Sequence, residues 1–198
     1  MKNIKKIIIG TNNNGKYKEI CALLPKRLKI FSPKKLKILS PKEIGASFEE
    51  NSAIKASYFS KKTNLVCLAD DSGLEIDVLG GEPGIYSARW GGKKNNFDLA
   101  IKKVLAKILR VKKKYLNNKK AKFICCLTLF WPNGKIYSCR GEVKGSIILE
   151  KRGLKGFGYD PIFVPNGYKK TFSEMDPFLK MSIDHRYKAY AKLKNFFI

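Results

Sequence analysis

Short apolar segments alternate with helix-forming segments along the first half of this 198-residue chain. Residues 5–10 and 65–69 have the character of buried strands, and residues 14–24 have the pattern of a helix that ends at Pro25. Because sheets and helices bury their apolar sides against one another, this alternation favours an α/β fold. We therefore expect an α/β chain with a mixed β-sheet.

The rest of the chain continues the same pattern. Ser47 and Glu50 form a capping box that opens a helix to about Thr63, and Asn96 caps the clearest helix of the chain. An Asn-Gly turn at 133–134 predicts a β-hairpin. The predicted elements beyond those already named are strands at 36–39, 74–78, 123–131, 136–143 and 162–164, a helix over 97–109 and a last helix over about 184–196.

Composition narrows the class of protein. Hydrophobic residues make up 44% of the chain, which is enough for a sizeable core. The longest apolar run, 123–131, is too short to span a bilayer, and residues 7–9 are too short for a signal-peptide core. Five cysteines without a Cys-x-x-Cys pair, together with one histidine, argue against a zinc site or a disulfide framework. We expect a soluble, cytoplasmic protein without membrane association.

The net charge of +25 has two explanations. A basic chain binds nucleic acid by neutralising phosphates and releasing counterions. Compositional drift toward lysine is the alternative, because the lysines are spread over the whole chain and form no aromatic-interleaved repeat. We favour drift, with some electrostatic steering of anionic ligands and no specific nucleic-acid partner.

The sequence GTNNNGK at 10–16 follows a predicted strand and opens a predicted helix. A helix N-terminus offers unpaired N–H groups and a positive dipole end, so this position suits a phosphate, to which Lys16 adds a charge. The spacing also matches the first part of a P-loop, but Tyr17 stands where a P-loop needs Ser or Thr. A P-loop-like NTPase that releases orthophosphate therefore stays open as an alternative function.

Half of the sixteen acidic residues lie between Glu43 and Glu82. Asp70 and Asp71 end a buried strand, where successive side chains point to opposite faces. We expect one of them to face a site and the other to brace a turn at 70–73, and we expect Glu49 to be a surface charge. Carboxylates beside a phosphate loop are suitable ligands for Mg²⁺ and suitable groups to activate a water.

Residues 68–89, LADDSGLEIDVLGGEPGIYSAR, closely resemble the signature of the non-canonical purine NTP pyrophosphatase family, the inosine triphosphate pyrophosphatase group. Further matches occur at 11–16, at 47–56 (SFEENSAIKA), at 156–163 (GFGYDPIF) and at 185–186. The resemblance implies one domain over 1–198, with two lobes around a long central mixed β-sheet flanked by helices and an active-site cleft between the lobes. It also implies a homodimer and the Mg²⁺-dependent hydrolysis of ITP, dITP and XTP to the nucleoside monophosphate and pyrophosphate.

The resemblance also assigns roles to residues at the matching positions. It implies that Asp71 and Lys16 are catalytic and that Asp71, Glu43 and Glu50 bind the metal. The substrate-binding residues that it implies are Thr11, Asn12, Asn13, Asn14, Gly15, Lys16, Lys55, Ser72, Phe157, Gly158, Tyr159, Asp160, Lys180, His185 and Arg186.

The chemistry of these side chains is consistent with those roles. Phe157 and Tyr159 offer flat faces on which a purine stacks, although packing in the core is the alternative for both. Donors such as Lys180 and Arg186 favour a 6-keto purine, because it presents an acceptor where adenine presents a donor. The chain departs from the family pattern at Asp184, where Ser is usual, and a carboxylate there could pair with Arg186 or Lys188 or act as a helix cap.

Overall fold

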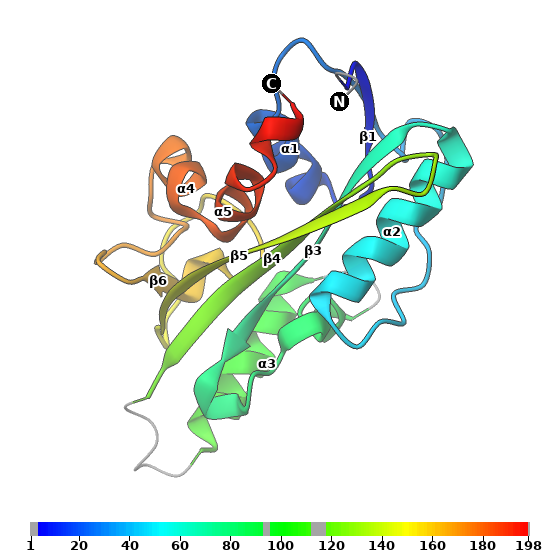
Figure 1. Cartoon of the computed structure of the whole chain (residues 1–198). Helices are drawn as coiled ribbons and strands as arrows, with labels where there is room; N and C mark the ends of the chain where they lie inside the picture. The colour runs from blue at the N-terminus through cyan, green and yellow to red at the C-terminus, as the bar shows by residue number, and fades with distance from the viewer. Residues whose placement is uncertain (1–3, 93–95, 112–117, 198) are drawn as a thin grey trace. The chain divides into compact units, whose positions relative to one another are not determined.

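The computed structural model describes residues 4–92, 96–111 and 118–197, and it has the expected α/β architecture (Figure 1). The strands are β1 (Lys6–Ile9), β2 (Lys29–Phe31), β3 (Val66–Ile76), β4 (Lys120–Phe130), β5 (Ile136–Ile147) and β6 (Phe163–Pro165). The helices are α1 (Asn14–Leu23), α2 (Phe48–Thr63), α3 (Phe97–Leu109), α4 (Pro177–Ile183) and α5 (His185–Ala191).

The six strands form one sheet in the order β2-β1-β3-β4-β5-β6. Strand β1 pairs in parallel with both β2 and β3, whereas β5 and β6 are antiparallel. The expectation of a mixed sheet flanked by helices is therefore confirmed. Within the described part of the chain, no helix combines the length and the apolar character that crossing a membrane requires.

Local sequence explains where the main helices begin. The Ser47 hydroxyl accepts the Glu50 N–H at the start of α2, and the Asn96 side chain accepts the Leu99 N–H at the start of α3. Each cap satisfies an N–H group that has no partner within its helix. Helix α2 ends at Asn64, whose φ of 52° lies in the left-handed region.

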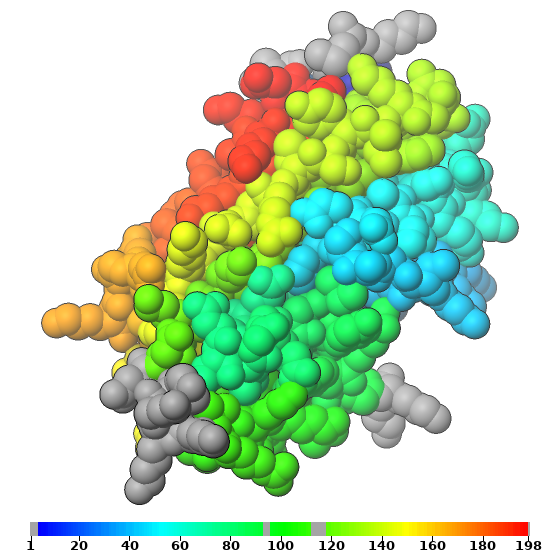
Figure 2. Space-filling model, turned by 60° about the horizontal axis from the view of Figure 1, so that its bottom comes forward, coloured from blue at the N-terminus to red at the C-terminus, as the bar shows by residue number. Residues whose placement is uncertain are grey.

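The chain divides into two compact units, and β3, β4 and β5 contribute residues to both. Unit 1 consists of Met1–Asp71, Cys125–Gly141 and Arg186–Ile198, and unit 2 consists of Ser72–Ile124 and Glu142–His185. In unit 1, α2 packs against one face of β1 and β3, while α1 and the C-terminal residues pack against the other face. In unit 2, the apolar stripe of α3 packs against β3 and β4 residues. Atoms of α3, in green, are visible at the surface in Figure 2.

Three sequence-based expectations are wrong. The predicted strands at 65–69 and 74–78 are parts of the single strand β3, so the expected turn at 70–73 does not exist. Asp70 and Asp71 remain in the strand because both carboxylates find cationic partners. Residues 36–39 form no strand, and the edge strand is β2 instead. The expected last helix is shorter than predicted, and the additional helix α4 precedes it.

Candidate functional site

The loop between β1 and α1 is held tightly against β3. The Gly10 N–H donates to the Leu68 carbonyl at 2.8 Å, and a Cβ at Gly10 would lie only 2.8 Å from the side chains of Cys67 and Ala69. A larger residue at Gly10 would therefore push the loop away from the strand. The close approach fixes the direction in which the N-terminus of α1 points.

Side chains of this loop are used to shape it. The side-chain amide oxygen of Asn13 (Oδ1) caps α1 by accepting the Lys16 N–H at 3.1 Å, and the Thr11 hydroxyl accepts the Asn13 N–H. The Asn12 amide donates to the Ile38 carbonyl and to the Ser40 hydroxyl. Helix geometry leaves the N–H groups of residues 14 and 15 without intrahelical acceptors. The loop can therefore bind an anion mainly through backbone N–H groups and the Lys16 charge, because the Asn12 and Asn13 side chains bond within the protein.

Asp70 is completely buried and lies between two cations. Its carboxylate is 3.3 Å from the Lys16 ammonium, and it accepts a hydrogen bond from the Arg186 guanidinium at 3.1 Å. Arg186 also pairs with Glu19 of α1. Burial opposes ionisation of Asp70, but Lys16, Arg186 and Lys55 outweigh it and hold the pKa of this carboxyl well below its usual range. Asp70 thus fixes two of the predicted site cations.

Asp71 points to the other side of β3 and meets a different cation. The Lys55 ammonium, buried in α2, donates to Asp71 Oδ1 at 2.7 Å and to Glu43 Oε1 at 2.5 Å. Asp71 Oδ2 is also buried, and it has no hydrogen-bond partner in the part of the chain that the structure describes. Half of this carboxylate is therefore open to an additional group.

Burial changes the proton affinity of this pair. It raises the pKa of the Asp71 carboxyl above its usual value, even though Lys55 and Lys16 act in the opposite direction. Burial also disfavours the charged form of Lys55, but Asp71, Glu43 and Asp70 outweigh it and raise the Lys55 pKa. A carboxylate with a raised pKa is a better proton acceptor than an exposed one, and this property suits a general base.

The structure does not bring Glu50 to Glu43 and Asp71. The Glu50 carboxylate accepts the Ala46 N–H at 2.8 Å and completes the cap of α2. Among residues 4–92, 96–111 and 118–197, no three acidic, histidine or cysteine side chains form a ready metal cluster. The capping requirement of α2 explains why Glu50 is turned toward its own helix. Glu49 pairs with Arg140 at the surface, as expected.

In unit 2 the predicted binding residues surround a tight turn. Asp160 Oδ2 accepts the Phe157 N–H at 2.9 Å and the Lys180 ammonium at 2.7 Å. The Lys180 ammonium also lies 5.4 Å from the centre of the Phe157 ring. Gly156 has a φ of 75°, and a Cβ there would lie 2.1 Å from Asp160 Oδ2, so the turn needs glycine. Asp160 holds the Phe157 ring and the Lys180 charge together.

Tyr159 does not share this arrangement. It is 2% exposed, it packs edge-to-face against Phe97 at 5.7 Å between ring centres, and its hydroxyl donates to the Ser87 carbonyl at 2.8 Å. Core packing, the alternative considered for both aromatic residues, therefore describes the Tyr159 ring. The Phe157 ring is partly exposed.

The last two predicted residues of unit 2 are also largely covered. His185 is buried and stacks on Phe123, with 4.9 Å between ring centres and 13° between planes. Ser72 follows Asp71 on β3 and is half-buried. The stack orients the His185 ring, and alternation along β3 directs the Ser72 side chain away from the face that Asp71 uses.

Sequence reasoning missed the partners of Arg186. One of the two adjacent aspartates was expected to brace a turn, and Glu19 was not considered. Strand alternation did predict that the two aspartates point to opposite faces, and each buried carboxylate in a basic chain requires its own cation. No local pattern connects Glu19 to an arginine 167 positions away.

Comparison with known proteins identifies the family of this chain. The model of the Ham1 family matches residues 7–196, and the chain belongs to this family. A protein named dITP/XTP pyrophosphatase from Caulobacter vibrioides is 42% identical, over 96% of each chain. A protein of the same name from Oceanobacillus iheyensis is 40% identical, over 96% of this chain and 97% of its own.

Solved structures give the same result. A HAM1 protein from Coxiella burnetii superposes with a TM-score of 0.86 at 34% identity, over 97% of this chain and 98% of its own. The Staphylococcus aureus Ham1 protein gives a TM-score of 0.84 at 34% identity, over 97% of each chain. These full-length matches favour the family resemblance over the P-loop alternative.

Proposed function

We propose that this chain hydrolyses dITP, XTP and ITP to the nucleoside monophosphate and pyrophosphate. The observation that carries the proposal is the state of Asp71: Lys55 holds one carboxylate oxygen, while the other is buried without a partner among the described residues. Relatives that are about 40% identical to this chain are named dITP/XTP pyrophosphatase. Their name indicates a hydrolysis reaction to which this carboxylate is suited.

Unit 1 handles the triphosphate under this proposal. Lys16, Lys55 and the N-terminus of α1 supply positive charge and N–H groups for the phosphate oxygens. Asp71 orients a water and accepts its proton as the water attacks the α-phosphorus, and the bond from this phosphorus to the bridging oxygen breaks. Release of pyrophosphate then places negative charge next to these same cations, which stabilise it.

The residues present fit Mg²⁺. Asp71 and Glu43 already share one cation, the Lys55 ammonium, and the buried Asp71 Oδ2 is a carboxylate oxygen that lacks a partner within the described ranges. Mg²⁺ is commonly held by one or two carboxylates, with water and substrate phosphates completing its coordination. Asp71 and Glu43 would hold the ion, which supplies charge neutralisation at the phosphates. Glu50 enters this set only if its capping bond to Ala46 breaks.

Unit 2 handles the base under this proposal. The Phe157 ring provides a stacking surface, and the Lys180 ammonium beside it provides a donor for the 6-keto oxygen that hypoxanthine and xanthine share. Asp160 keeps both groups in place. Loss of a hydrogen bond to a buried donor costs about 1–3 kcal/mol, which disfavours adenine in this position. Roles for Arg186 and His185 at the base, a cleft between lobes, homodimerisation and a cytoplasmic location stay predictions.

Product analysis tests the proposal. The chain is incubated with Mg²⁺ and each of ITP, XTP, ATP and GTP, and the products are separated by ion-exchange chromatography. We expect monophosphate and pyrophosphate from ITP and XTP, and a loss of at least about a hundredfold in turnover for Asp71→Asn, because general-base catalysis contributes roughly that much or more. Orthophosphate with diphosphate would contradict the proposal and favour a P-loop-like reaction.

A matched pair of variants separates the metal ligands. Glu43→Gln is expected to raise the Mg²⁺ concentration needed for half-maximal rate, while Glu50→Gln leaves it unchanged, because Glu50 caps its own helix. The reverse order would show that the capping contact opens when substrate binds. Absence of turnover with every triphosphate, together with salt-sensitive binding of DNA or RNA, would favour the nucleic-acid alternative instead.

A further inference from the structure

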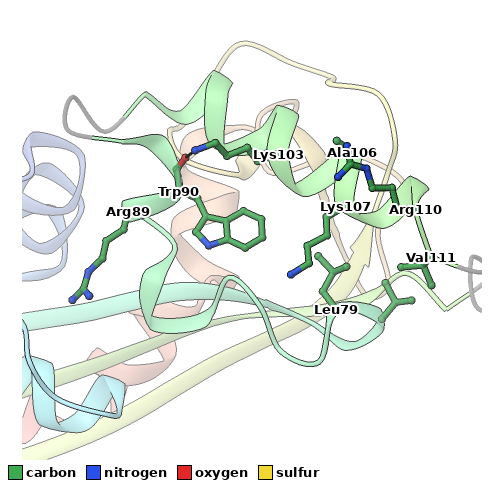
Figure 3. A pocket seen from close by; sticks show the side chains of 9 residues that line it. Leu79, Arg89, Trp90, Lys103, Ala106, Lys107, Arg110 and Val111 are labelled. Atoms are coloured by element: carbon green, nitrogen blue, oxygen red, sulfur yellow. Dashed lines mark hydrogen bonds between the residues drawn. The ribbon is translucent and has the colours of Figure 1, made fainter.

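A cavity of about 800 Å³ lies beside α3, within unit 2. Its volume falls in the range of roughly 300–1,000 Å³ that is typical of small-molecule sites. We call it the α3 cavity (Figure 3). It is lined by Val78, Leu79, Arg89, Trp90, Lys103, Ala106, Lys107, Arg110 and Val111. None of these nine residues belongs to the predicted catalytic, metal or substrate set, so this cavity is separate from the residues of the proposed reaction.

The charged residues that line the α3 cavity are all basic. Lys103 and Lys107 extend from α3, and Arg110 follows its last turn. Lys107 pairs with the half-exposed Glu82, and Lys103 donates to the Trp90 carbonyl at 2.9 Å. Figure 3 shows that Arg89 extends away from the indole, and its guanidinium lies over the Tyr86 ring instead. One carboxylate beside three cations leaves a positive charge that favours an anionic ligand.

Trp90 adds an aromatic surface to this charge. Its ring is partly exposed in the cavity, and the Lys107 ammonium lies 5.6 Å from the ring centre. The side chains of Val78, Leu79, Ala106 and Val111 supply apolar walls. A flat aromatic group that stacks on the indole would bring an attached anion close to the Lys107 ammonium, and Arg110 adds a second positive charge to the lining of the cavity.

We propose that the α3 cavity binds a nucleoside monophosphate, with the base on Trp90 and the phosphate on Lys107 and Arg110. The inference goes beyond the proposed hydrolysis and does not depend on it. Base stacking on an aromatic side chain tolerates different bases, so no strict base preference is expected. The positive charges of Lys107 and Arg110 near the C-terminus of α3 would also offset the helix dipole, but that role requires neither the cavity nor the partly exposed indole.

The indole N–H of Trp90 provides a direct readout. The chain has two tryptophans, so in Trp131→Phe the one remaining indole N–H signal in a ¹⁵N NMR spectrum belongs to Trp90. Guanosine monophosphate is titrated into this variant at low salt. We expect a saturable shift of the Trp90 signal, with a dissociation constant between micromolar and millimolar.

Two further variants in the Trp131→Phe background locate the binding. Lys107→Glu with Arg110→Glu is expected to weaken binding tenfold or more, because each charge-assisted hydrogen bond typically contributes at least that factor. Lys16→Ala, at the predicted phosphate loop, is expected to leave the Trp90 titration unchanged. The dispersion of the remaining amide signals shows whether each variant is folded.

Several results would overturn the proposal. No shift of the Trp90 signal at about 10 mM nucleotide excludes it, and so does a shift that Lys16→Ala abolishes while the charge reversals do not. Inorganic phosphate that binds as tightly as the nucleotide would show that the indole contributes nothing. Preferential binding of a single-stranded oligonucleotide would assign the surface to nucleic acid instead.

Discussion

Replacing Asp70 by Asn tests the buried charge cluster of unit 1. The substitution keeps the size of the side chain but removes the negative charge that lies 3.3 Å from Lys16 and 3.1 Å from Arg186. Removal of one partner from a buried ion pair typically costs about 3–5 kcal/mol. Lys16 is 16% exposed and Arg186 keeps Glu19, so the lower end, about 3 kcal/mol, is expected.

A loss of this size is easy to measure. For a chain of this length, each kcal/mol lowers the melting temperature by about 2–4 °C, which gives a decrease of roughly 6–12 °C for Asp70→Asn. Urea-induced unfolding, followed by circular dichroism, gives the free energy of unfolding independently. Glu19→Gln is the matched control, because it removes the partly exposed partner of the same arginine, and about 1 kcal/mol is expected for it.

The outcome also decides how Lys16 and Arg186 are held. A loss below about 1 kcal/mol for Asp70→Asn, with an unchanged urea dependence, would refute the reasoning, because the two cations would then not depend on Asp70. A loss for Glu19→Gln that equals or exceeds the loss for Asp70→Asn would place the main contact of Arg186 on α1 instead of β3.

Three shorter predictions concern single positions. Gly156→Ala is expected to cost about 1–3 kcal/mol in thermal unfolding, more than Gly134→Ala, since only at 156 does the new Cβ meet a carboxylate as well as a positive φ. Ser47→Ala is expected to cost about 1 kcal/mol in the same assay because the α2 cap is lost, and no change would contradict the capping role. Burial raises the pKa of Cys126 to about 11, so its thiol should resist alkylation at pH 8 in the native protein, and equal reactivity in native and unfolded protein would refute this. Because the folded state favours the protonated thiol, the free energy of unfolding should also fall as the pH rises above the unfolded-state pKa of about 8.5.

The fold was predictable where local patterns are strong. The stripe of α3, the caps at Ser47 and Asn96 and the Asn-Gly hairpin all depend on residues that are near one another in sequence, and the structure confirms them. Strand β3 was divided wrongly because two adjacent aspartates indicate a turn unless distant cations neutralise them. Pairing of Asp70 with Arg186 is a tertiary contact across 116 positions, and no local pattern predicts it.

The site was predictable in part for the same reason. Family motifs indicated Lys16, Lys55 and Asp71, and the structure places each of them at a buried carboxylate–cation contact. The motifs do not distinguish a side chain that faces a ligand from one that supports its neighbours. Tyr159 and Glu50 both lie within segments that match the family motifs. Only the structure shows that Tyr159 packs in the core and that Glu50 caps α2.

Lys55 acts as a tethered counterion between Glu43 and Asp71. A divalent cation held by Asp71 and Glu43 would compete with this ammonium group for the two carboxylates, so its binding would be partly an exchange and not a simple addition of charge. A displaced ammonium group would stay attached to α2 and would need a new anion, which a phosphate would provide. Cation and phosphate are therefore expected to bind cooperatively, each raising the affinity for the other by the same factor. Without a phosphate the chain should hold a divalent cation weakly, so Glu43 and Asp71 should stay paired with Lys55 when no substrate is bound.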